Sequence, residues 1–129
     1  MHIDHLAIWV SDLEGMKNFY CNYFGATAGP RYINPVKQFE SYFVSFEKGP
    51  RLELMKMPGV QRSLNDPYQQ IAGLVHFAIS VGSADTVDEM ALKFQENGLE
   101  ILDGPRITGD GYYECVILDP ELNRVEITA

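Results

Sequence analysis

The sequence predicts an α+β fold in which two tandem β-α-β-β-β modules form a curved mixed sheet around a cleft. Strand-like segments occur twice: residues 3–10 (IDHLAIWV) are echoed by residues 74–81 (LVHFAISV), and residues 51–54 (RLEL) by residues 124–127 (RVEI). In both halves a stretch with apolar residues at helical spacing follows the first strand-like segment. A supersecondary unit that recurs along the chain indicates two similar halves. We therefore expect a single domain, residues 1–129, built by duplication.

The first module covers residues 1 to about 57. Ser11 or Asp12 is suited to cap a helix, and Gly25 is suited to end it. Aromatic and β-branched residues crowd the later segments, as is typical of strands, and a Lys-Gly-Pro sequence at 48–50 indicates the turn between the last two. The expected elements are a strand at 3–10, a helix to about residue 24, a short strand within 26–32, and strands at 38–47 and 51–57.

The second module covers residues 74 to about 129 and follows a polar linker at about 58–73, the kind of connection that a fused duplication needs. Ser83 is suited to cap its helix, and Asn97-Gly98 to end it. A glycine-rich loop is expected from Gly104 to Gly111. The expected elements are a strand at 74–81, the helix, a short strand at 100–102, a strand at 112–118, a hairpin turn at 119–123 and a strand at 124–128.

Composition and charge exclude several classes of partner. The apolar share of 46% is ordinary for a globular protein, and no apolar run approaches the roughly 20 residues of a membrane span. A net charge of -8 argues against a nucleic-acid partner. Acidic residues interrupt the N-terminal stretch, so we expect no signal peptide. The two cysteines lie in separate segments, which indicates reduced thiols in a cytoplasmic protein.

Each module carries one histidine and one glutamate inside an otherwise apolar strand. These are His5 and Glu53 in the first module and His76 and Glu126 in the second; the histidines are 71 positions apart and the glutamates 73. Burying unpaired imidazoles and carboxylates is costly, and a divalent metal ion that binds all four offsets the cost. Two nitrogen and two oxygen donors suit such an ion. We predict that these four residues are metal ligands.

Each of the four also has a plainer interpretation. A histidine in a strand is often a hydrogen-bonded core or cleft residue, and the two glutamates can pair with Arg51 and Arg124, which precede them by two positions. Their equivalent positions in both modules favour the shared metal site.

These residues resemble the vicinal oxygen chelate superfamily, which includes glyoxalase I, methylmalonyl-CoA epimerase, fosfomycin-resistance transferases, extradiol dioxygenases and bleomycin-binding proteins. The resemblance covers nearly the whole chain. It lies in IDHLAI at 3–8 with Phe-Tyr at 19–20, GLVHFAI at 73–79, and Asp-Pro at 119–120 before Val-Glu-Ile at 125–127. It implies the glyoxalase-like fold of paired modules, a metal in the cleft and a homodimer.

Ligand order sorts the members of that superfamily. Extradiol dioxygenases and fosfomycin-resistance enzymes resemble a His, His, Glu set, epimerases a His, Gln, His, Glu set, and bleomycin-binding members lack the ligands. His5, Glu53, His76 and Glu126 are most similar to the bacterial glyoxalase I arrangement, which implies nickel or cobalt, with zinc, manganese or iron as the other candidate ions. The implied function is a glyoxalase-like lyase or isomerase acting on a small substrate with vicinal oxygens through a metal-bound enediolate. Glu126 or Glu53 would carry the proton as general base.

Two departures from the glyoxalase pattern argue against glutathione as the cosubstrate. Trp9 stands where such enzymes carry an arginine, and Met57 or its neighbours stand where they carry an asparagine. Trp9 and Met57 would form an aromatic, polarizable wall of the substrate pocket, which suits an apolar or aromatic substrate. Alternatively, both residues simply fill the core of the cleft. Tyr42, Tyr112 and Tyr113 are the other expected substrate-binding residues.

Two alternative functions remain open. An extradiol-dioxygenase-like enzyme needs Fe(II) and an open facial triad, which four protein ligands fit less well. A non-catalytic binding protein, similar to the bleomycin-resistance members, would instead hold a small aromatic molecule or drug in the same cleft. The site can form within one chain or between equivalent modules of two subunits.

Overall fold

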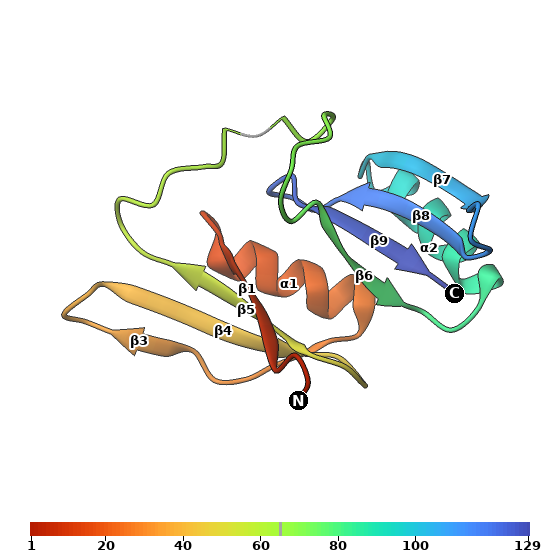
Figure 1. Ribbon diagram of the computed structural model, residues 1–129. Helices are drawn as coiled ribbons and strands as arrows, with labels where there is room; N and C mark the ends of the chain where they lie inside the picture. Colours follow the sequence, from red (N-terminus) through yellow and green to blue (C-terminus); the bar gives the residue numbers. More distant parts are fainter. Residues whose placement is uncertain (65) are drawn as a thin grey trace. The chain divides into compact units, whose positions relative to one another are not determined.

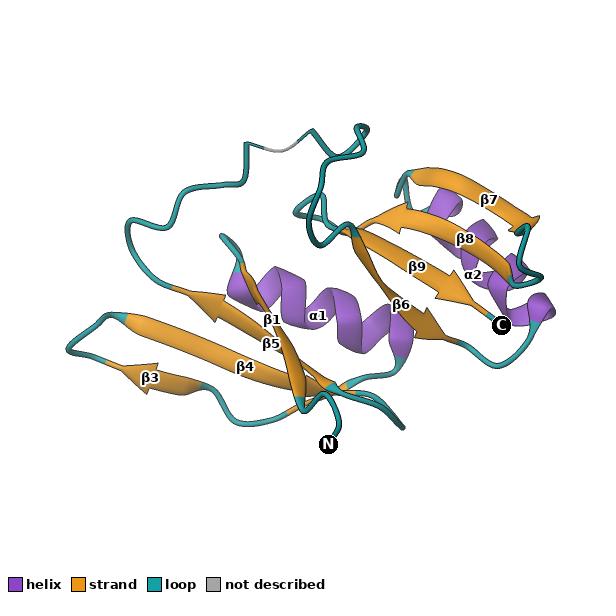
Figure 2. Ribbon diagram, in the orientation of Figure 1, coloured by secondary structure: helices purple, strands orange, loops and turns teal. Residues whose placement is uncertain are grey.

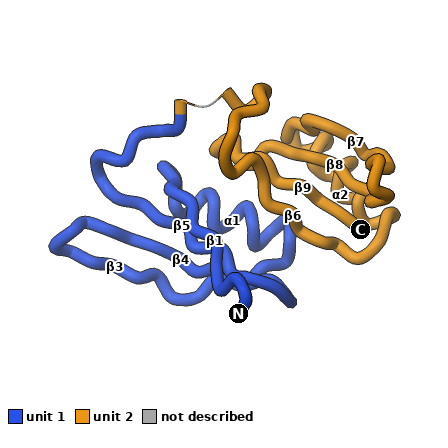
Figure 3. Tube along the Cα trace, in the orientation of Figure 1, with its two compact units in different colours: residues 1–63 blue, residues 64–129 orange. Residues whose placement is uncertain are grey.

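The structure is a computed structural model that describes residues 1–64 and 66–129 (Figure 1). It divides the chain into two compact units, residues 1–63 and 64–129, with the boundary inside the predicted linker (Figure 3). Among the described residues, each unit contains one helix and one mixed sheet (Figure 2). The predicted α+β class and its two-module organisation are confirmed. Every strand pairing recorded in the described ranges lies inside one unit.

Unit 1 forms a sheet in the order β1-β5-β4-β2, with β3 also paired to β4. β1 runs parallel to β5, and the other pairs are antiparallel. The short strand β3 was not predicted as a separate element, because the Gly-Pro and Asn-Pro signals around it indicate turns. The elements are β1 (His5–Trp9), α1 (Leu13–Phe24), β2 (Thr27–Ala28), β3 (Tyr32–Asn34), β4 (Phe39–Ser45) and β5 (Arg51–Lys56).

The helix α1 begins and ends where the sequence predicts. The side chain of Asp12 accepts a hydrogen bond from the Gly15 N–H at 3.0 Å, and Gly25 adopts the left-handed conformation, φ 62°, that closes the C-terminus. One face of the helix packs against the sheet. The buried residues on this side are Leu13, Met16, Phe19 and Tyr20 of α1 with Val44, Leu52 and Leu54 of the sheet.

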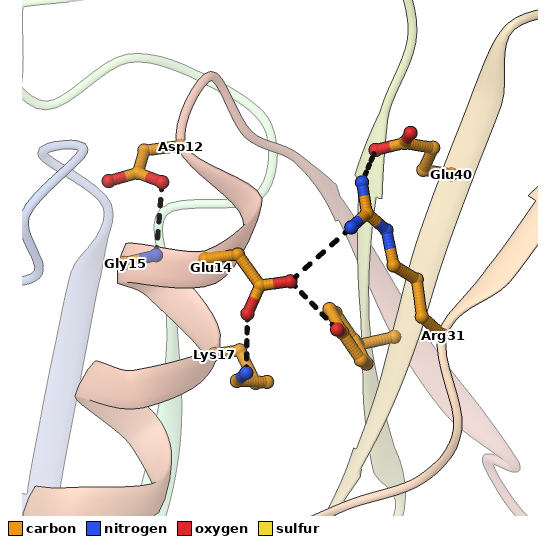
Figure 4. A network of polar contacts seen from close by, with 7 residues as sticks. Asp12, Glu14, Gly15, Lys17, Arg31 and Glu40 are labelled. Atoms are coloured by element: carbon orange, nitrogen blue, oxygen red, sulfur yellow. Dashed lines mark hydrogen bonds and ion pairs between the residues drawn. The ribbon is translucent and has the colours of Figure 1, made fainter.

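A polar network connects α1 to the same face of the sheet (Figure 4). The Glu14 carboxylate accepts hydrogen bonds from Lys17 Nζ at 2.5 Å and from the Tyr42 hydroxyl at 2.7 Å. Arg31 lies 3.7 Å from Glu14 and donates to Glu40 at 2.5 Å. These bonds lower the pKa of the Glu14 carboxyl, first through Lys17 and then through Tyr42. The Tyr42 side chain therefore lies on the face of the sheet that α1 covers.

Unit 2 repeats this plan, with a sheet in the order β6-β9-β8-β7 and β6 parallel to β9. Its helix is capped by Ser83, whose hydroxyl accepts from the Thr86 N–H. The elements are β6 (His76–Ser80), α2 (Ala84–Glu96), β7 (Ile101–Ile107), β8 (Tyr113–Leu118) and β9 (Arg124–Thr128). The buried residues of α2, Val87, Ala91 and Phe94, lie with Cys115, Ile117, Val125 and Ile127 in the core of this unit.

The glycine-rich stretch differs from the prediction, because β7 continues through Gly104 instead of ending in a loop at that residue. The pairing of β7 with β8 shifts register twice, between Ile101 and Asp103 and between Asp103 and Arg106. Gly104 has φ 79°, and a Cβ there would lie 2.5 Å from the Glu114 carbonyl oxygen. Only glycine allows this close approach, so the residue marks a bulged strand.

The two cysteines, Cys21 and Cys115, are free thiols, one in each unit. Cys115 is 1% exposed, and burial raises the pKa of its thiol to about 11. It is therefore protonated at neutral pH. Across residues 1–64 and 66–129, none of the helices has the length and apolar character needed to cross a membrane.

Candidate metal centre

In unit 1, His5 and Glu53 lie on the sheet face opposite α1, which we call the ligand face. The parallel register places Ala7 beside Glu53, so His5 is its diagonal neighbour two residues earlier on β1. Nε2 of His5 lies 3.9 Å from Oε2 of Glu53. The imidazole side chain is 39% exposed and the carboxylate side chain 16%. The first predicted pair of ligands is therefore brought together.

Unit 2 forms the equivalent pair by the equivalent register. Ala78 lies beside Glu126, and His76 is again the diagonal neighbour on the parallel strand. Nε2 of His76 lies 3.3 Å from Oε2 of Glu126, with side-chain exposures of 43% and 16%. The repeat seen in the sequence is thus also a repeat of strand pairing and of side-chain contact.

The neighbouring arginines have other partners. Arg51 donates to Asp4 at 2.5 Å, and Arg124 Nε donates to the Pro67 carbonyl oxygen at 2.7 Å. The ion pairs that the described ranges record for Glu53 and Glu126 join them to histidines. The alternative in which these carboxylates simply pair with Arg51 and Arg124 is therefore not what the structure contains.

Asp4 is a functional candidate that the sequence analysis missed. Its Oδ2 lies 2.8 Å from Nδ1 of His5, and it accepts the hydrogen bond from Arg51. These two hydrogen bonds lower the pKa of the Asp4 carboxyl, His5 having the larger effect. The signal was available, because a carboxylate directly before a candidate ligand histidine can reach its ring.

Glu114 is a second missed residue, and it lies in unit 2. It is 8% exposed and pairs with Thr128, which places it on the ligand face, diagonal to Glu126. Burial raises the pKa of the Glu114 carboxyl, and the charge of Glu126 raises it further. Arg106 lies 3.6 Å from Glu114 and 2.6 Å from Asp103. The predicted hairpin turn at 119–123 contained the signal, since it sets the register that pairs β8 with β9.

The donor types fit a divalent metal ion. Each unit offers an imidazole Nε2 and a carboxylate oxygen that face one another, and these are borderline and hard donors of the kind that zinc, nickel and cobalt accept. Two donors are half of a tetrahedral protein set. In the described ranges, 1–64 and 66–129, no group of three or more His, Cys, Asp or Glu side chains could hold a metal ion. The four predicted ligands thus form two separate pairs, His5 with Glu53 in unit 1 and His76 with Glu126 in unit 2.

Trp9 lies on the ligand face of unit 1, in line with His5 along β1. The residue is 43% exposed, and its ring makes an edge contact with Phe39, with 6.0 Å between the ring centroids. The centroid of the Phe39 ring lies 6.0 Å from that of the Tyr32 ring. We call Trp9, Phe39 and Tyr32 the aromatic cluster. Met57 is half-buried just after the end of β5, and Tyr112 is exposed just before β8.

The other two predicted substrate residues, Tyr42 and Tyr113, lie on the helix-covered faces. The Tyr42 hydroxyl donates to Glu14 of α1, and the Tyr113 hydroxyl donates to Asp88 of α2 at 2.7 Å. Strand alternation explains the placement, because their neighbours Phe43 and Glu114 occupy the ligand faces. These tyrosines tie each helix to its sheet, and we do not include them in the proposed site.

Residues 2–127 match the family described as the Glyoxalase/Bleomycin resistance protein/Dioxygenase superfamily. A glyoxylase/bleomycin resistance protein/dioxygenase domain from Frankia sp. EAN1pec is similar in structure, with TM-score 0.81 and 16% identity, over 99% of this chain and 96% of that one. The trypanothione-dependent glyoxalase I of Leishmania major has TM-score 0.77 and 21% identity, over 99% and 86%. The fosfomycin resistance protein FosX of Listeria monocytogenes has TM-score 0.69 and 19% identity, over 98% and 89%. No curated protein sequence matches the chain significantly.

Proposed function

Because the chain belongs to the Glyoxalase/Bleomycin resistance protein/Dioxygenase superfamily, we propose that it is a metal-dependent, glyoxalase-like lyase or isomerase. Its substrate is a small molecule with vicinal oxygens. The observation that carries the proposal is the duplicated pair: in each unit, a histidine Nε2 faces a largely buried glutamate on the ligand face. A single pair has simpler explanations, whereas the same pair at equivalent register in both units supports a shared chemical role.

We propose that His5, Glu53, His76 and Glu126 together hold one divalent metal ion, nickel or cobalt in the first place and zinc, manganese or iron otherwise. Members of the superfamily typically use a divalent metal. When bound, the ion supplies Lewis-acid chemistry to the vicinal oxygens of the substrate. Glu126 or Glu53 carries a proton between adjacent substrate carbons as general base.

The aromatic cluster supports an apolar or aromatic substituent on the substrate. Trp9 and Tyr32 are both more than one-third exposed, and they lie on the face that carries His5 and Glu53. Aromatic surface of this kind binds planar or apolar groups more readily than a charged tripeptide. We therefore propose that glutathione is not required, and that Met57 and Tyr112 border the substrate.

The metal site is tested by elemental analysis of protein purified without chelator. The expected result is one divalent ion per chain, lost in His76→Ala and in Glu126→Gln. Glu47→Gln, which changes an exposed glutamate in the turn after β4, is the matched control and is expected to keep the ion. Wild-type protein that binds none of the five metals would contradict the proposal.

The reaction class is tested on the metal-loaded protein. Proton transfer between adjacent carbons predicts incorporation of solvent deuterium at a substrate carbon, detected by mass spectrometry during an unbiased metabolite screen. Methylglyoxal hemithioacetal is included in the screen. Absence of turnover of that compound with nickel, cobalt and zinc would remove the glyoxalase I assignment, while oxygen consumption with iron would indicate the dioxygenase alternative.

A non-catalytic binding protein is the second candidate, and the exposed aromatic cluster is the observation that favours it. Such a protein would bind a small aromatic molecule without a metal. Tight binding of an aromatic ligand that persists in His76→Ala and in chelator would support this candidate over the enzyme.

We also propose that the protein is a cytoplasmic homodimer with a small-molecule partner. Complementation decides whether one chain or two complete the metal site. A heterodimer of His5→Ala and His76→Ala chains regains one complete set of four ligands if the site is shared between copies. It regains none if each chain holds its own set, so its metal content separates the two arrangements.

A further inference from the structure

The two histidine–glutamate pairs differ in what lies behind the imidazole. In unit 1, Nδ1 of His5 lies 2.8 Å from the Asp4 carboxylate. At the counterpart position in unit 2 the residue before His76 is Val75, whose side chain has no acceptor. Both halves therefore have the histidine–glutamate pair, but only the first half has a carboxylate directly before the histidine in the chain. Duplication alone does not explain this contact between Asp4 and His5.

The contact determines which ring nitrogen of His5 carries the proton. A carboxylate can only accept a hydrogen bond, so Nδ1 must be the donor in a neutral imidazole. Nε2 then carries the free lone pair, and it is Nε2 that lies 3.9 Å from Glu53 on the ligand face. A metal ion binds the unprotonated nitrogen, so this tautomer presents the ring ready for coordination.

Asp4 is itself held in place. Arg51, the direct partner of His5 in the parallel pairing, donates to the same Asp4 oxygen at 2.5 Å. The Arg51 guanidinium lies over the Phe43 ring, 4.3 Å from its centroid, and the His5 ring meets the same phenyl edge-on at 5.3 Å. The phenyl ring, the guanidinium and the carboxylate together fix the orientation of the imidazole.

We propose that Asp4 and Arg51 are positioning residues for His5: Asp4 fixes the Nδ1–H tautomer and Arg51, stacked on Phe43, holds Asp4 in place. This inference rests on the proposed metal site in assigning His5 as a ligand. Hydrogen-bond partners behind ligand histidines commonly change metal affinity by 10- to 100-fold. The unit 1 histidine is then preorganised for coordination by a carboxylate that the residue before His76 does not supply.

The first test is tautomer assignment by ¹H–¹⁵N NMR of the histidine rings in the metal-free, full-length protein at neutral pH. Wild-type His5 is expected to show the Nδ1–H form, and Asp4→Ala to shift it toward the Nε2–H form. Asp4→Asn retains an acceptor oxygen and is expected to restore the wild-type pattern in part. The His76 signals serve as the internal control, since they remain unchanged if the fold is intact.

The second test is metal affinity, measured with Ni²⁺ and Co²⁺ by calorimetry. Asp4→Ala is expected to weaken binding by about 10- to 100-fold, and Arg51→Met by less. Val75→Asp, which places a carboxylate before His76, is expected to strengthen it. An unchanged His5 tautomer in Asp4→Ala, or an affinity within twofold of wild type, would overturn the inference. Wild-type protein that binds no metal refutes the proposed function, and the tautomer measurement still decides the role of Asp4.

Discussion

At the level of single residues, the two halves share the histidine–glutamate pair but differ in the side chains next to it. The histidine–glutamate pairs stand at repeated positions and were predicted as metal ligands from the sequence alone, but the side chains beside them do not repeat. Asp4 corresponds to Val75, and Glu114 corresponds to Ser41, which pairs with Met55 as Glu114 pairs with Thr128. Comparison of the two halves cannot find such residues. Strand register was needed to show that Glu114 shares a face with Glu126, whereas Asp4 directly precedes a candidate ligand histidine in the sequence.

The raised pKa of Glu114 predicts that the free energy of unfolding falls as the pH rises. Its folded pKa lies above the ordinary value of 4.5, chiefly because of burial. The folded state therefore binds this proton more tightly than the unfolded state. The stability that the protonated Glu114 contributes is fully present below about pH 4.5 and is lost as the pH rises through the pKa of the folded state. We expect Glu114→Gln to flatten this fall and to be more stable than wild type at pH 8. Urea unfolding in chelator between pH 4.5 and 8 measures the difference, and parallel curves for the two proteins would contradict it.

The two thiols should differ in reactivity. Cys115 is buried with its pKa raised to about 11, so almost none of it is thiolate at pH 8. We expect iodoacetamide to label Cys21 in the native protein and to label both cysteines after denaturation. Peptide mass spectrometry assigns the sites, with Cys21→Ser as the control. Rapid native labelling of Cys115 would show that the unit 2 core opens readily.

At the level of elements, the hairpin between β8 and β9 sets the position of Glu126. The buried Asp119 carboxylate accepts hydrogen bonds from the Glu121 N–H and the Asn123 N–H, both at 2.9 Å, and from the Asn123 side chain. The sequence predicted this turn and both strands. It did not predict that β7 continues through Gly104. A glycine in the sequence indicates a turn, and it indicates a β-bulge only when the close approach of a neighbouring strand is known.

Asp119→Ala removes the acceptor for those donors, which are partly buried. We expect the free energy of unfolding to fall by about 2 kcal/mol. Asp110→Ala is the matched control, since Asp110 accepts from Thr108 in an exposed loop and its loss should cost less than about 0.5 kcal/mol. Chemical denaturation measures both. Equal effects would show that the Asp119 bonds do not stabilise the turn.

For the molecule as a whole, two donors per unit mean that neither unit should hold the proposed ion alone. Added Ni²⁺ or Co²⁺ stabilises the folded state by about 2.7 kcal/mol at 100 times Kd, which raises Tm. We expect His5→Ala and His76→Ala each to abolish the rise, and His2→Ala, which removes an exposed histidine, to retain it. Differential scanning calorimetry gives the shifts. A full shift in either of the first two variants would exclude that histidine as a ligand.

The confinement of strand pairing to single units has a consequence for chain order. No recorded backbone ladder in residues 1–64 and 66–129 depends on which half is synthesised first. A circular permutant that starts at residue 64, runs to 129 and continues through a flexible glycine-serine linker into residues 1–63 keeps every one of those ladders. Evolution could therefore have reordered or separately inherited the halves without rebuilding either sheet.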